Sequence, residues 1–221
     1  MKKILYLVMS AVLFAACASE DIVESDYGYL QLDDIAVDSR VTELPLTKLV
    51  EGGMRVQICQ DGQVLPEHDY APGTLFDKRF LIPAGTYTVK AFTDNHEEAA
   101  SGDLGKGAYS VESEPFQVEK GSLTTISLVA PLLNTAVRVA FAPLTLTDFP
   151  DINVTITSVS GRTVTVAGAK YNNAYCYFDV PADGRLTYEI KMTNADGQAF
   201  SIPGVLEDVK AGHYEIKVDV Q

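Results

Sequence analysis

Hydrophobic and polar residues alternate along most of the chain from Tyr27 onward. A period of two places successive side chains on opposite faces of an extended strand and is typical of strands with one buried face. The pattern therefore predicts an all-β chain. The alternating runs are Tyr27–Asp33, Met54–Cys59, Thr86–Phe92, Phe116–Glu119, Leu123–Val129, Ala136–Phe141, Ile152–Val159, Thr163–Val166, Tyr175–Val180, Leu186–Met192 and Tyr214–Val220.

Turn residues separate these runs at regular intervals. Asp61-Gly62, Ser160-Gly161, Asp183-Gly184 and Asp196-Gly197 supply the positive φ angles that tight hairpins need. Many short strands with regular turns predict a sandwich or a barrel.

An internal repeat indicates two units of this kind. The segment Ile82–Lys90 recurs with a short insertion as Val180–Lys191, and Val118–Leu128 is similar to Val209–Asp219 in the same order. We therefore predict two tandem antiparallel β-sandwich domains, Ig-like in type, over residues 27–130 and 131–221.

Both copies of the repeat contain a tyrosine shortly after proline and glycine, Tyr87 in the first and Tyr188 in the second. Proline and glycine shape a turn into a strand, and a tyrosine just beyond can bury its ring while its hydroxyl caps a backbone group, as in a tyrosine corner. The interpretation of these two tyrosines is structural.

The first residues form a predicted export signal, residues 1–16. Lys2 and Lys3 precede an apolar run, Ile4 to Ala16, that is shorter than the about 20 residues of a transmembrane helix. The run ends in Leu13-Phe14-Ala15-Ala16-Cys17, which resembles a bacterial lipobox with Cys17 as the lipidated residue. An ordinary signal peptide with an incidental cysteine is the alternative.

Residues 17–26 are polar and acidic without a period, which predicts a flexible tether. The stretch from Ala18 to Asp21 resembles the acidic tag of surface-exposed Bacteroidetes lipoproteins. It favours an outer-membrane protein facing the cell exterior, and the periplasmic face remains the alternative.

The charge balance argues against one class of partner. The chain has 17 basic and 30 acidic residues and a formal net charge of −13, whereas nucleic-acid binding needs Lys and Arg to neutralise phosphates. Cys59 and Cys176 lie in strand-like runs of different halves, which predicts buried free thiols rather than a disulfide or a metal site.

The sequence offers no catalytic motif. His68, His96 and His213 are scattered, and none lies in a nucleophile, phosphate-loop or dinucleotide motif. We predict a chain that is not an enzyme and binds no cofactor, and we interpret His96-Glu97-Glu98 as a solvated polar loop. An oxygen-rich turn leaves a weak calcium hypothesis, with the candidate ligands Asp148, Asp151 and Asn153.

Glycan binding is a further possibility for a surface lipoprotein. Tyrosines could stack on sugars, although tryptophan is absent and tyrosine in strands more often packs in the core. Two long connections, Pro66 to Lys78 and Thr93 to Lys106, suit either functional loops or tolerated insertions. The candidate stacking residues are Tyr27, Tyr29, Tyr70, Tyr109, Tyr171, Tyr175 and Tyr177.

The order of several motifs resembles an uncharacterised lipoprotein family that is abundant in gut Bacteroides. Its members carry a domain of unknown function and are distantly similar to fimbrillins, and the family has no catalytic residue to carry over. This chain departs from them in the longer, glycine-rich path between Ala100 and Tyr109. The motifs are Gly28–Leu32, Ile82–Ala91, Tyr109–Phe116, Phe116–Ile126 and Leu133–Val139.

The resemblance implies a non-enzymatic surface module of fimbrillin-like fold, adhesin-like or an accessory or anchor of a fimbria-like assembly. Its partners would be other surface or fimbrial subunits, or a glycan. A glycan-binding accessory lipoprotein of a polysaccharide uptake system is the alternative. Fimbrillins exchange strands after proteolysis at a basic residue, which makes Arg40 the candidate processing site. The favoured alternative is that Arg40 is an ordinary loop residue in a domain that keeps its first strand, and an anchor subunit would also stay uncut.

Overall fold

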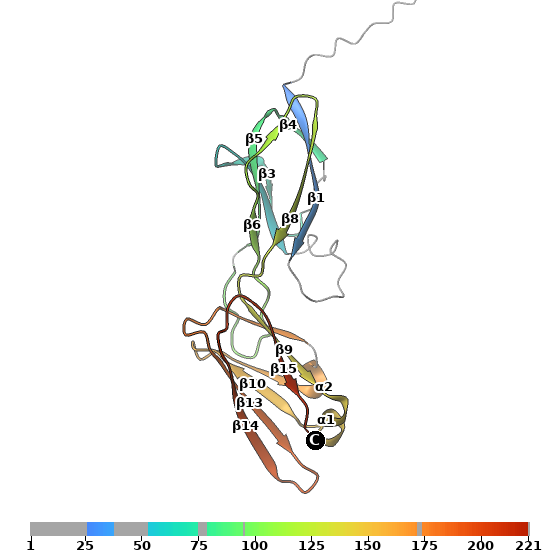
Figure 1. The fold of residues 1–221 in the computed structure, drawn as a ribbon, viewed down its shortest axis with the longest axis vertical. Coiled ribbons are helices and arrows are strands. Elements are labelled where there is room, and N and C mark those ends of the chain that lie inside the picture. The colour runs from blue at the N-terminus through green and yellow to red at the C-terminus, as the bar shows by residue number, and fades with distance from the viewer. Residues whose placement is uncertain (1–25, 38–52, 75–78, 95, 172–173, 221) are drawn as a thin grey trace, which may run out of the picture.

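The computed structural model describes residues 26–37, 53–74, 79–94, 96–171 and 174–220. Within them the chain forms fifteen strands and two short helices, α1 (Pro143–Asp148) and α2 (Gly168–Tyr171), so the predicted all-β class is confirmed. Figure 1 shows an elongated molecule in which the strands of the first and second halves of the chain form two bodies arranged end to end.

Two sheets pack against each other in the first half. One has the strand order β4 (Arg79–Pro83), β1 (Tyr27–Val37), β8 (Leu123–Ala130). The other has the order β3 (Gln63–Tyr70), β2 (Met54–Gln60), β5 (Gly85–Thr93), β6 (Ser110–Glu112), and β7 (Phe116–Val118) also pairs with β5. Alternate side chains of both sheets turn inward and form one buried cluster, which includes Leu30, Ile58, Ile82 and Val89.

The second half has the same plan. One sheet has the order β12 (Tyr175–Phe178), β9 (Thr135–Phe141), β15 (Gly212–Val218). The facing sheet has the order β11 (Thr163–Ala167), β10 (Asn153–Thr157), β13 (Leu186–Thr193), β14 (Ala199–Leu206). Their inward side chains form a second buried cluster, which includes Val139, Ile156, Phe178 and Leu186.

One pairing in each half differs from the predicted antiparallel arrangement. The first strand of each half lies in the middle of a three-stranded sheet, and its last strand runs parallel to it, as β1–β8 and β9–β15. The last strand is reached by crossing over from the other sheet rather than through a hairpin, so the connection does not force it to be antiparallel. Each half has its own buried cluster and the same strand topology, which fits the predicted domain organisation. Independent folding of residues 27–130 and 131–221 stays a prediction.

Two sequence expectations need correction. The segment from Pro66 to Lys78 is not one long loop, because strand β3 continues through Pro66 to Tyr70 at the edge of its sheet, where a missing N–H donor is tolerated. Strand β1 does not end at Asp33, because it continues to Val37 after a register shift between Leu32 and Asp34.

Candidate functional site

The outer face of sheet β4-β1-β8 carries a group of exposed apolar side chains that we name the β1 face. Strand alternation turns Leu30 into the core and Tyr29 outward. Tyr29 lies directly opposite Leu81 on β4 and Leu123 on β8, so the three side chains adjoin. The exposed fractions are 44% for Tyr27, 40% for Tyr29, 51% for Leu81 and 47% for Leu123.

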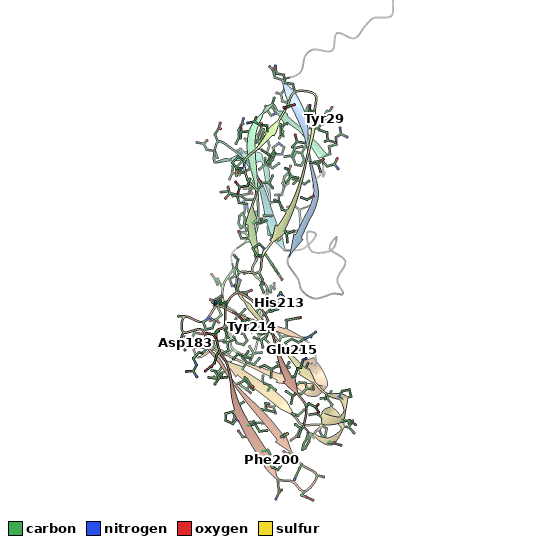
Figure 2. All side chains as sticks on the ribbon, viewed as in Figure 1. Tyr29, Asp183, Phe200, His213, Tyr214 and Glu215 are labelled. Atoms are coloured by element: carbon green, nitrogen blue, oxygen red, sulfur yellow. The ribbon has the colours of Figure 1, made fainter. Side chains whose placement is uncertain are left out.

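A cation borders the β1 face. The guanidinium carbon of Arg79 lies 4.5 Å from the centre of the Tyr29 ring, which is a cation–π distance. Figure 2 places Tyr29 on the end of the molecule where β1 begins, and the C-terminus marked in Figure 1 lies toward the other end. Adjoining exposed apolar side chains of this size are typical of a contact surface.

The connection between β5 and β6 binds the second half of the chain. Arg162, only 5% exposed, donates from Nη2 to the carbonyl oxygen of Asp103 and from Nη1 to that of Tyr177, each at 2.6 Å. Its guanidinium also stacks 4.5 Å from the centre of the Phe178 ring. One buried cation thus joins the two halves; we name this arrangement the Arg162 clamp.

Backbone hydrogen bonds reinforce the clamp. The amide of Gly102 donates to Thr163 O at 2.8 Å, and the amide of Tyr177 donates to Leu104 O at 2.7 Å. Gly105 has a φ of +77°, and a Cβ there would lie 2.9 Å from Tyr177 O, so this close approach requires glycine. The side chain of Leu104 packs against the second core.

His96 and Glu97 are exposed, as expected of a solvated polar cluster, and His96 and Glu98 also contact the second half of the chain. His96 Nε2 lies 3.2 Å from Asp179 Oδ1, and Glu98 Oε2 accepts a hydrogen bond from the Ser160 hydroxyl at 3.1 Å. The connection Thr93 to Lys106 therefore attaches one half of the chain to the other. No sequence signal identifies this role, because its partners are far away in the chain.

Four of the described candidate stacking tyrosines are partly buried against other residues, and two are exposed. Tyr109 and Tyr177 share a hydrogen bond at the junction, and burial raises the pKa of both phenols, that of Tyr177 to about 12. Tyr70 packs with His68 and Phe80, and Tyr175 meets His213 edge-on. Among the described candidates, only Tyr27 and Tyr29 are exposed. The side chain of Tyr171 lies outside the described residues.

The two turn tyrosines have different surroundings. Tyr87 is 1% exposed, and its hydroxyl donates to Pro83 O at 2.7 Å across the turn into β5. Tyr188 is half-buried on β13 and covers Gly204 on β14, where a Cβ would lie 2.1 Å from the ring. The repeat in sequence is therefore not a repeat in local packing.

The oxygen-rich turn is partly occupied by its own hydrogen bonds. Asp151 Oδ1 accepts from the amide of Thr193 at 3.1 Å, and hydrogen bonds with the side chain and then the backbone of Thr193 lower the pKa of the carboxyl. Asn153 Nδ2 donates to the carbonyl oxygen of Asp151, and Lys191 lines the same hollow, which opposes a cation. Asp148 is the last residue of α1. Calcium at this turn stays a hypothesis that the geometry does not strengthen.

Two predicted sites, Cys17 and Arg40, lie outside the described residues. Cys59 and Cys176 are buried free thiols as predicted, and burial raises the pKa of Cys176 to about 11. Among the described residues there is neither a group of three His, Cys, Asp or Glu side chains able to hold a metal nor a helix long and apolar enough to cross a membrane.

Comparison with protein-family profiles identifies the family of this chain. A profile of the domain of unknown function DUF4493 matches residues 26–221, and no curated protein matches the chain. The chain is similar to a fimbrial assembly protein from Parabacteroides distasonis, with 11% identity, a TM-score of 0.42 and coverage of 86% of this chain and 90% of that chain. It is also similar to a candidate cell adhesion protein from Bacteroides ovatus, with 9% identity, a TM-score of 0.47 and coverage of 86% and 92%. Since the family profile spans nearly all of the described chain, the protein belongs to the DUF4493 family.

Proposed function

We propose that this chain is a non-enzymatic cell-surface lipoprotein, adhesin-like or an accessory or anchor component of a fimbria-like assembly. The β1 face is the observation that carries the proposal. Tyr27, Tyr29, Leu81 and Leu123 adjoin on one sheet and remain exposed, although burying such side chains against a partner would be favourable.

The position of this face suits an anchored protein. Strand β1 begins at Tyr27, so a tether over residues 17–26 would enter directly beside the face. The face would then lie at the membrane-proximal end, within reach of another subunit that is also held at the membrane. The Arg162 clamp would hold the second half away from the membrane as a rigid extension.

The double substitution Tyr29→Ser and Leu81→Ser tests the β1 face. The wild-type protein, extracted from envelopes in mild detergent, is expected to run on a non-denaturing gel in a complex larger than the monomer. The double variant is expected to run as the monomer, because it loses two adjoining apolar anchors of the interface.

The matched control is Leu144→Ser with Val159→Ser, two exposed apolar residues on the other half of the chain, at 73% and 60% exposure. It should leave the complex intact, and circular dichroism should show both double variants folded. A wild-type protein that is monomeric in envelope extracts, or a complex that survives both double substitutions, would reject the role of the β1 face.

The predicted anchor has its own test. The variant Cys17→Ala is expected to lose incorporation of a fatty-acid analogue and to leave the membrane fraction. Mass spectrometry of the mature N-terminus then shows whether the chain is processed after Arg40. Acylated Cys17 indicates an uncut anchor subunit, whereas a terminus at Val41 indicates processing after Arg40, which would free β1 from between β4 and β8. A labelled, membrane-bound Cys17→Ala protein would contradict the lipoprotein proposal.

A second candidate function is glycan binding as an accessory lipoprotein of an outer-membrane polysaccharide uptake system. The observation that favours it is a cleft at the junction of the two halves, where apolar surface lies beside a carboxylate and an imidazole. An assembly subunit should be found with other surface proteins, whereas a glycan-binding accessory should be retained on an immobilised polysaccharide.

A further inference from the structure

The two halves of the chain enclose a cleft of about 430 Å³, which we name the junction cleft. This volume lies within the range of about 300–1,000 Å³ that is usual for small-molecule sites, and such sites often lie between domains. Its walls come from both halves of the chain. The lining residues from the first half are Phe92, Thr93, His96, Ala108, Tyr109 and Ser110, and those from the second are Leu133, Asn134, Asp179 and Val180.

Part of the lining of the junction cleft is apolar. Leu133 and Val180 are 50% and 42% exposed, although each is a large aliphatic residue beside the contact between the halves. The ring of Phe92 contributes from the end of β5. These side chains form a surface that a ligand with an apolar face would cover.

The lining also contains polar groups. His96 Nε2 lies 3.2 Å from Asp179 Oδ1, and the Asp179 side chain is 55% exposed, so its carboxylate keeps lone pairs for further donors. The hydroxyl of Ser110 lies on the same lining. None of the ten lining residues is Lys or Arg, so the junction cleft is not suited to a phosphate or sulfate group.

Hydrogen bonds between the halves fix the walls. Asn134 accepts from the amide of Ala108 at 3.1 Å and donates to Lys106 O at 2.9 Å, while the amide of Leu133 donates to Ala108 O at 2.7 Å. Within the first half, the amide of Thr93 donates to Tyr109 O at 2.8 Å. A site whose walls are tied in this way loses little conformational freedom when a ligand binds.

We propose that the junction cleft binds one neutral pyranose unit of a polysaccharide. A pyranose presents a C–H face, which suits Leu133, Val180 and Phe92, and a rim of hydroxyl groups, which suits Asp179 and His96 as acceptor and donor. This inference rests on the glycan-binding candidate function. The site is separate from the β1 face, so binding of a sugar does not depend on whether that face binds a partner subunit.

The test is an array of neutral gluco-, manno-, galacto- and xylo-oligosaccharides, with sialylated and sulfated glycans beside them, probed with the full chain in detergent. At least one neutral oligosaccharide is expected to bind, and calorimetric titration gives its affinity. Asp179→Asn and Leu133→Ser are each expected to weaken binding about tenfold or more, since each removes one of the two kinds of contact.

The control variants are Val159→Ser, an exposed aliphatic residue outside the junction cleft, and the β1-face pair Tyr29→Ser with Leu81→Ser. Both should keep the affinity of the wild-type protein, and unchanged melting temperatures show that all variants fold. Absence of binding to every neutral oligosaccharide, a preference for the anionic glycans, or binding that survives the cleft variants would overturn the proposal. Loss of binding in the β1-face pair alone would move the sugar site to that face.

Discussion

Replacing Tyr87 with alanine is expected to lower the free energy of unfolding of the first half by about 3–5 kcal/mol, the usual cost of truncating a large buried aromatic residue. The ring is 1% exposed in the first core and packs near Phe116. Truncation would leave a cavity and would also remove the donor to Pro83 O. Urea unfolding followed by circular dichroism and tyrosine fluorescence measures the loss, since the chain has no tryptophan.

Two further variants separate the contributions of Tyr87. Tyr87→Phe keeps the ring and loses only the hydrogen bond to Pro83, so a loss of about 1 kcal/mol is expected. Tyr27→Ala, on the exposed β1 face, should change the stability by no more than about 0.5 kcal/mol. If Tyr87→Ala costs as little as Tyr27→Ala, the turn into β5 does not depend on the buried ring.

The variant Arg162→Met is expected to lower the free energy of unfolding by about 2–4 kcal/mol, because it removes two charge-assisted hydrogen bonds and leaves the carbonyl groups of Asp103 and Tyr177 without this donor. Methionine keeps most of the length and apolar contact of the side chain. Residues 98–107 should also exchange their amide hydrogens faster, because the clamp no longer holds Asp103 against the second half.

Arg185→Met is the matched control. Arg185 is 53% exposed, and its ion pair with Glu207 spans 3.6 Å, so its loss should change the stability by no more than about 0.5 kcal/mol. Hydrogen exchange of residues 98–107 should stay at the wild-type rate. Equal effects of the two arginine variants on stability and on exchange would show that the Arg162 clamp does not hold the junction.

Strands with a buried and an exposed face could be predicted from the sequence, since most of their inward residues are apolar and many of their outward residues are polar. Strand β14 could not, because it lies at a sheet edge, contains Pro203 and Gly204, and exposes apolar residues such as Phe200 and Ile202. Strand β3 was not predicted for a similar reason, since Pro66 interrupts its alternation of apolar and polar residues. The sequence of neither β1 nor β8 indicates that the two strands pair in parallel.

The surfaces were less predictable than the strands. Tyr27 and Tyr29 were candidates from their residue type, but only the register with β4 and β8 shows that Leu81 and Leu123 adjoin them. The junction depends on pairs that are far apart in the chain, such as Arg162 with Asp103, and a single sequence contains no signal for such pairs. Polar loop residues look alike whether they contact solvent or another part of the protein.

The parallel pairing of β1 with β8 also sets an order of folding events while the chain is being synthesised. Strand β1 can complete its sheet only after β8 has been synthesised, and β8 follows β1 at nearly the full length of the first half. Until then the inward side chains of β1, among them Leu30 and Leu32, lack the contacts that β8 provides on one side. Pairing across so long a stretch of chain is slow, so each half is expected to depend on protection from aggregation until its final strand arrives.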